Sequence, residues 1–229
     1  TIMIFEKTVQ PNGLRVISST ISHNQSVCLT VFIGSGSRYE KSEKAGIAHF
    51  TEHLSFKGTV KRPTAREISE AIEGVGGVLN GGTDKELTVY WAKVATPYFP
   101  MAVDLLLDML QNSLISQEEV EKERRVITEE INMINDLPQM QVDQLMDQLL
   151  WPGGQALGRD VAGSKETVAA LKSGDLRNFV KKQYIPNNSV FAIAGDMMHS
   201  KALKLIEKAV SGWGKGKRPV FTPSVNGQS

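Results

Sequence analysis

The sequence has few of the features that would assign a chain to a class at a glance. Cys28 is the only cysteine among 229 residues, which excludes a disulfide within the chain. Because it lies in the apolar run VCLTVFI, we expect a small core residue rather than a nucleophile or a metal ligand. No apolar run approaches the roughly 20 residues that cross a bilayer, so we expect no membrane-spanning segment.

The sequence also has little net charge and no recognisable secretory signal at its start. Lys and Arg number 26 against 25 Asp and Glu, so the net charge is +1, and we expect neither nucleic acid nor an anionic membrane as a partner. The first residues, TIMIFEKTVQ, lack the basic start and the long apolar stretch of a secretory signal. This favours the cytoplasm, but a signal removed before Thr1 would leave the same sequence, so the compartment stays open.

The apolar pattern predicts strands mainly in the first third of the chain and helices mainly after Pro97. The predicted strands cover residues 3–9, 13–19, 27–33, 77–83, 86–94 and 189–194. Helices are predicted around residues 49–53 and over 64–75, 97–111, 116–134, 138–150, 164–171, 173–184 and 199–212. This order favours an α+β fold, a roughly six-stranded, mainly antiparallel sheet with helices packed on it.

The segment His49-Phe50-Thr51-Glu52-His53 is the most informative part of the sequence. It is the zinc-peptidase pattern H-E-x-x-H written backwards. On a helix, His53 lies about 40° from His49 and Glu52 about 60° away on the other side, so all three share one face. Two imidazoles can then bind one metal ion while a carboxylate stands beside it, which is what water activation needs.

The alternative is a pair of core histidines satisfied by hydrogen bonds. Ile47, Phe50 and Leu54 cover the other side of the same helix, so the helix should be buried on both sides. Three polar side chains on one buried helix face cost free energy unless a partner compensates them. The spacing therefore favours a metal site over a structural one.

A zinc site needs a third protein ligand. We expect His23, in a polar turn, and His199, at the start of a late helix, to lie at the surface, which leaves a carboxylate. Along residues 116–134, Glu123 and Glu130 lie two turns apart beside the apolar stripe, whereas Glu129 points toward solvent. Either inward carboxylate needs a cation or strong donors, and Glu123 could instead orient a histidine. The stripe consists of Val120, Ile127, Ile131 and Ile134.

At this point the chain resembles a known family along nearly its whole length. The matching segments are GSRYE, GIAHFTEHLSFKGT, GGVLNGGTDKELTVYW, ERRVITEEINM, LGRDVAG and YIPNNSVFAIAGD. They resemble the pitrilysin and mitochondrial processing peptidase family of inverted-motif zinc metallopeptidases. The resemblance implies one Zn²⁺ held by His49, His53 and Glu130, with Glu52 as the general base and Glu123 as a supporting acid.

The resemblance also implies a peptide substrate that adds a strand to a sheet edge at residues 78–84. The residues expected to bind it are Leu79, Asn80, Gly81, Gly82 and Thr83. Family members usually carry a small residue and then an aromatic one after the Asn. Because this chain has two glycines there, we predict a less regular strand at 81–82.

Active members of this family pair two homologous halves, within one chain or across subunits, and a dimer of such chains is a further arrangement. We therefore interpret residues 1–216 as the zinc-binding catalytic domain. Residues 217–229 would be a tail or linker toward a second homologous domain, and residues 1–229 alone should show weak or no activity. Two alternatives remain: a non-catalytic core or scaffold subunit of the same family, and a different inverted-motif zinc hydrolase acting on a small molecule.

Overall fold

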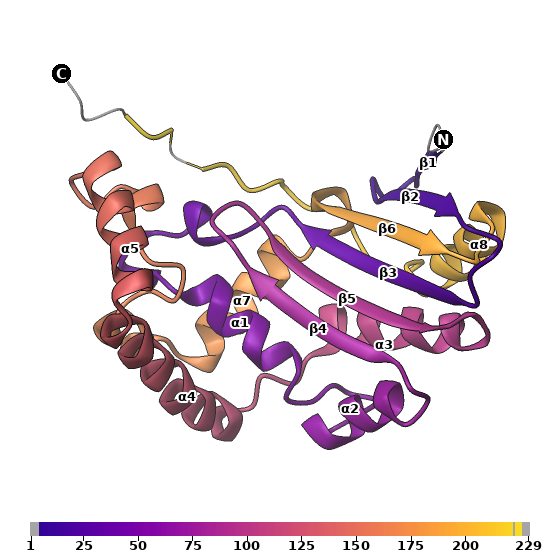
Figure 1. The fold of residues 1–229 in the computed structure, drawn as a ribbon, viewed down its shortest axis with the longest axis horizontal. Coiled ribbons are helices and arrows are strands. Elements are labelled where there is room, and N and C mark those ends of the chain that lie inside the picture. Colours follow the sequence, from indigo (N-terminus) through magenta and orange to yellow (C-terminus); the bar gives the residue numbers. More distant parts are fainter. Residues whose placement is uncertain (1–4, 222, 226–229) are drawn as a thin grey trace.

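A computed structural model describes residues 5–221 and 223–225. It is an α+β fold built on one six-stranded sheet with the order β1-β2-β6-β3-β5-β4 (Figure 1). Every neighbouring pair is antiparallel except β2 and β6. The strands are β1 Glu6–Val9, β2 Arg15–Thr20, β3 Ser26–Ile33, β4 Val78–Thr83, β5 Thr88–Ala95 and β6 Ser189–Gly195. All six were predicted; residues 3–4 of the first predicted strand lie outside the described residues.

The helices also occur where the apolar pattern predicted them. They are α1 Ile47–Ser55, α2 Ala65–Glu73, α3 Phe99–Asn112, α4 Gln117–Asp136, α5 Pro138–Leu150, α6 Lys165–Ala170, α7 Ser173–Gln183 and α8 His199–Ala209. Thr64 begins α2 with a reciprocal capping box to Glu67, which satisfies the first backbone N–H groups of that helix. Among residues 5–221 and 223–225, no helix combines the length and the hydropathy needed to span a membrane.

The core lies against one face of the sheet, because buried and half-exposed residues alternate along β3. Leu29, Val31 and Ile33 are fully buried on that face, opposite Tyr90 of β5. Cys28 lies on the other, half-exposed face, so the prediction of a core cysteine is wrong. The run VCLTVFI looks continuously apolar, but the period of two sends every second side chain away from the helices.

Strand β4 forms one edge of the sheet, next to α1 (Figure 1). It pairs with β5 along its whole length, including Gly81 with Tyr90 and Gly82 with Val89, so the predicted irregularity at 81–82 is wrong. A Cβ on Gly81 would lie 2.9 Å from Cζ of Phe56, whose ring packs directly on this strand. Full pairing with β5 and this close ring contact offset the freedom that two glycines bring.

Candidate metal centre

Helix α1, which carries His49, Glu52 and His53, is held at its first turn by a carboxylate from the preceding loop. The N–H groups of Gly46 and Ala48 donate to the two carboxylate oxygens of Glu40 at 2.9 and 2.8 Å. Gly46, the N-terminal cap, has φ 90° and no side chain to do this itself. Glu40 thus satisfies backbone donors that would otherwise be buried without a partner.

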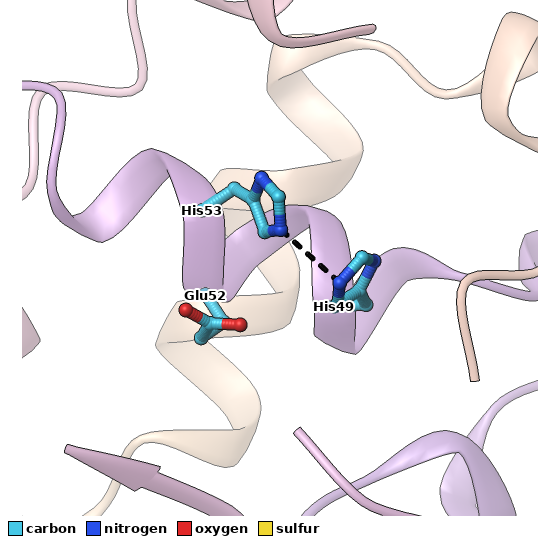
Figure 2. Close-up of side chains that lie close together, drawn as sticks. All are labelled: His49, Glu52 and His53. Carbon is cyan, nitrogen blue, oxygen red and sulfur yellow. Dashed lines mark hydrogen bonds between the residues drawn. The ribbon is translucent and has the colours of Figure 1, made fainter. Parts of the chain in front are cut away.

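The two histidines face each other across one turn of α1. Their Nε2 atoms lie 3.1 Å apart, and Glu52 projects from the same turn (Figure 2). One ligand atom from each of the three residues lies within 4.8 Å of the others. His49 and Glu52 are buried, as expected for a helix that packs against α4, α7 and β4. The structure therefore gathers the three motif residues on one face, as their spacing predicted.

Helix α4 brings two further carboxylates to the same place. Oε1 of Glu130 lies 3.7 Å from Nε2 of His49, and its Oε2 lies 3.7 Å from Nε2 of His53. Glu123, which is buried, accepts a hydrogen bond from Nδ1 of His53 at 2.8 Å and another from the Lys57 ammonium at 2.8 Å. Glu129 is exposed on the far side of the helix. Both inward glutamates chosen from helix periodicity thus meet the histidines.

The separations between these atoms suit a metal ion. Three ligand atoms around a tetrahedral zinc, with bonds of about 2.0–2.2 Å, lie about 3.3–3.6 Å from one another. The Nε2 atoms of His49 and His53 and the Glu130 carboxylate are separated by 3.1, 3.7 and 3.7 Å. With His53 donating its Nδ1–H to Glu123, its Nε2 carries a free lone pair aimed at the shared point. Two imidazoles and a carboxylate are a donor set that zinc prefers.

The pKa shifts of His49, His53 and Glu52 suit metal binding and proton transfer. Burial, with the neighbouring His53, lowers the pKa of His49 to about 4, so His49 is neutral at physiological pH. Burial alone would lower the pKa of His53, but the Glu123 hydrogen bond and the nearby carboxylates outweigh it and raise that pKa. Burial raises the pKa of Glu52, only partly opposed by His53. A carboxylate with a raised pKa is a stronger base, which suits proton transfer near neutral pH.

Residues 79–83 lie on β4, beside α1. Because Asp84 N–H donates to Leu87 O at 2.8 Å, the antiparallel alternation turns the backbone N–H and C=O groups of Leu79, Gly81 and Thr83 toward the free edge. The side chain of Asn80 already occupies one of these groups, since Gly81 N–H donates to its Oδ1 at 2.8 Å. The predicted peptide-binding segment thus presents a partly free strand edge next to the metal centre.

The two remaining histidines differ from each other. His23 is exposed, as predicted. His199 is buried, so its prediction as a surface residue is wrong: its Nδ1 lies 2.7 Å from Ser18 Oγ and its Nε2 2.8 Å from Thr8 Oγ1. It ties α8 to β1 and β2 with both ring nitrogens, which satisfies a buried imidazole without a metal.

Two residues of the site were missed by the sequence analysis. Lys57, which pairs with Glu123, follows His53 by four positions, and that spacing is the signal that could have found it. Glu40, which caps α1, is one of five charged residues in the loop 34–46, which gives no periodic pattern. Only the folded chain brings it to the N-terminus of the helix.

Comparison with known proteins gives consistent matches. The family model for insulinase (peptidase family M16) matches residues 15–163, and that for the peptidase M16 inactive domain matches residues 170–228. An uncharacterized zinc protease of Streptomyces coelicolor is 40% identical over 217 residues, which are 95% of this chain and 47% of that protein. The probable mitochondrial-processing peptidase subunit beta of Arabidopsis thaliana is 37% identical over 204 residues, 88% of this chain and 38% of that protein.

Solved structures share the fold. The crystal structure of pitrilysin matches 99% of this chain and 25% of its own with a TM-score of 0.86, at 22% sequence identity. The chain spans about half the length of the curated relatives it matches first. The two family models meet between residues 163 and 170, yet β6 lies between β2 and β3, so residues on both sides of that junction build one sheet.

Proposed function

Because the chain belongs to the insulinase family of peptidases, family M16, we propose that it is the catalytic half of a zinc-dependent endopeptidase. It would cleave extended peptides or unfolded segments. One observation carries the proposal: the Nε2 atoms of two buried histidines and the carboxylate of Glu130 converge on one point, with Glu52 beside them.

In this proposal His49, His53 and Glu130 hold zinc. A zinc ion there would lower the pKa of its water ligand and polarise a peptide carbonyl. Glu52 takes a proton from the attacking water and passes it to the leaving amine, a role that its raised pKa supports. Glu123 keeps the proton of His53 on Nδ1, so that Nε2 stays free to bind the metal, and Lys57 balances the charge of Glu123.

The substrate would bind as an additional strand on β4. The outward N–H and C=O groups of Leu79, Gly81 and Thr83 recognise a peptide backbone and make little demand on its sequence. Asn80 would release the N–H of Gly81 as the peptide arrives, and Gly82, whose missing Cβ faces open space, leaves room for a side chain of the substrate. This geometry supports an extended peptide rather than a small molecule as the substrate.

The test separates metal binding from proton transfer. Glu52→Gln keeps the shape of the side chain but removes the base, so we expect one zinc per chain as before and a loss of about 10²–10⁴-fold in cleavage of a fluorogenic peptide by the native full-length protein. His53→Ala should lose the zinc as well. Glu129→Gln, an exposed change on α4, is the control and should alter neither. A Glu52→Gln protein that still cuts peptides would refute the role of Glu52.

A non-catalytic core subunit of the same family is the main alternative. It predicts no tightly bound zinc and no loss of function in Glu52→Gln. All the proposed ligands are present and converge in this chain, which weighs against it. Zinc analysis of the purified chain decides between the two.

A further inference from the structure

The loop that leads from β3 to α1 contacts both the helix of the metal centre and the strand proposed to bind the substrate. It covers residues 34–46, and we call it the β3–α1 loop. Its Glu40 is 8% exposed and accepts hydrogen bonds from the N–H groups of Gly46 and Ala48, at 2.9 and 2.8 Å. His49 follows directly, so the loop holds the turn of α1 that carries the first proposed metal ligand.

The same loop contacts the turn between β4 and β5. Ser37 N–H donates to Asp84 O at 3.3 Å, and Figure 1 shows the tip of this hairpin beside the loop. Arg38 N–H donates to Lys85 O at 2.8 Å. The two backbones approach so closely that a Cβ on Gly36 would overlap the Asp84 carbonyl. Because Asp84 directly follows the last residue of β4, the loop also holds the end of the strand on which the peptide would bind.

A third segment closes these contacts into a ring. Nη2 of Arg159 donates to the backbone oxygen of Glu40 at 2.7 Å. Nζ of Lys85 donates to Leu157 O at 2.6 Å. Residues 157–159 therefore contact the β3–α1 loop and the β4–β5 turn at the same time. A shift of any one segment past the other two would leave polar groups without their partners, which costs free energy.

Cleavage requires the metal and the substrate carbonyl to lie at a fixed separation. The proposed ligands His49 and His53 and the proposed base Glu52 lie on α1, whereas the peptide would be held by β4. A displacement of about 1 Å between reacting groups can lower a rate about 100-fold. The packing of Phe56 on Gly81 holds the end of α1 against β4, and the ring of contacts around the β3–α1 loop holds its beginning.

We propose that Glu40 is a positioning residue for peptide cleavage: it binds the start of α1 from a loop that also holds the β4–β5 turn, and so fixes where the metal ligands lie relative to β4. The proposal rests on the proposed function, because it needs a metal on α1 and a peptide on β4. Glu40 touches neither of them and acts through α1. The alternative is an ordinary helix cap, which would stabilise α1 without fixing its position relative to β4.

The first test compares kcat and KM for a fluorogenic peptide in the native full-length protein, at equal zinc content. Glu40→Ala removes both acceptor oxygens, and we expect kcat to fall about 10–100-fold. KM should change less than about threefold, because the strand edge that binds the peptide stays intact. Glu40→Gln keeps one acceptor oxygen and should recover part of the lost kcat. Glu43→Ala, an exposed change in the same loop, is the matched control and should keep both parameters.

The second test needs neither zinc nor cleavage. It measures amide hydrogen exchange in the zinc-free full-length protein, in peptides that cover the β3–α1 loop and the start of α1. Glu40→Ala should speed exchange at the start of α1, where two N–H groups lose their acceptor, and also at Ser37 and Arg38, whose N–H groups bind the β4–β5 turn. An ordinary cap predicts faster exchange at the start of α1 alone. Glu43→Ala should change neither segment.

The outcomes separate this proposal from the proposed function. Unchanged kcat in both Glu40 variants, a loss carried by KM, or faster exchange confined to the start of α1 would overturn the proposal. If Glu40→Ala does not fold, Glu40→Gln decides by the same two measurements. A native protein that binds no zinc and cleaves no peptide would refute the proposed function, whereas exchange at Ser37 and Arg38 would still decide whether Glu40 links α1 to β4.

Discussion

Glu123 offers the sharpest test of how the site is held together. It is 4% exposed and joins His53 Nδ1 to Lys57 Nζ through two contacts of 2.8 Å each. In Glu123→Ala the imidazole loses the acceptor that fixes its tautomer and ring orientation. Loss of such a partner typically weakens metal binding 10–100-fold, or about 1.4–2.7 kcal/mol. Glu123→Gln keeps one carbonyl acceptor, so its loss should lie near about 10-fold.

Proton competition adds a pH dependence to this effect. Glu123 raises the pKa of His53, so in the unsubstituted chain protons compete with zinc for His53 more strongly as the pH falls. Without Glu123, burial still lowers that pKa while its hydrogen-bond acceptor and one of the three neighbouring carboxylates are gone, so the pKa falls relative to the unsubstituted chain and the competition weakens. The difference in zinc affinity between the unsubstituted chain and Glu123→Ala should therefore be largest near pH 8 and become smaller toward pH 6.

The measurement is a competition titration against a chromophoric zinc chelator at several pH values. Glu129→Ala, on the exposed side of the same helix, is the control, because it loses only a 3.2 Å hydrogen bond with Asn132. Metal-free Glu123→Ala should also unfold at lower urea, by about 1–3 kcal/mol, since a buried imidazole N–H loses its acceptor. Zinc affinity equal to that of the unsubstituted chain at pH 8, or an equal loss in Glu129→Ala, would refute the reasoning.

Two further predictions concern the frame around the site. The folded state raises the pKa of Glu40 from 4.5 to about 7, mainly by burial, so its contribution to stability is complete below pH 4.5 and is lost as the pH rises through 7. We therefore expect the free energy of unfolding of the metal-free unsubstituted chain, measured in urea relative to Glu40→Gln, to fall by up to about 3 kcal/mol across that pH window. A difference between the two proteins that does not change with pH would contradict this. Gly81→Ala places a Cβ 2.9 Å from the Phe56 ring and should cost about 1–3 kcal/mol, whereas Gly82→Ala meets open space and should be neutral or slightly stabilising. Equal urea midpoints for these two variants would contradict the packing of Phe56 on β4.

Much of this site could be predicted because its residues follow local periodicities. His49 and His53 share a face by their spacing of four, and Glu123 and Glu130 share one by their spacing of seven, so helix geometry alone selected both pairs. The helices and strands were predicted for the same reason. The order of the strands was not predicted, because β6 enters between β2 and β3 through contacts with residues more than 150 positions away.

The errors share a physical cause: burial is decided by what packs on a residue, and this is not local. His199 looked like a surface residue because it begins a helix, yet hydroxyl groups from β1 and β2 satisfy both of its ring nitrogens. Cys28 looked buried because its neighbours are apolar, yet only alternate residues of β3 meet the helices. Glu40 gave no signal, since its partners are backbone N–H groups of another segment.

Charge balance gives an independent reason for a divalent cation at this site. Glu52, Glu123 and Glu130 bring three negative charges around two histidines, and Lys57 returns one positive charge. With both histidines neutral, as metal ligation requires, the cluster carries a formal charge of −2. Glu52 and Glu123 are buried, and burial raises the pKa of Glu52, with a smaller contribution from the carboxylates of Glu130 and Glu123. A net negative charge of this size costs free energy in a partly buried site unless a cation offsets it. One Zn²⁺ neutralises it, so the carboxylates that make the metal-free site unfavourable are the ones that make the ion bind.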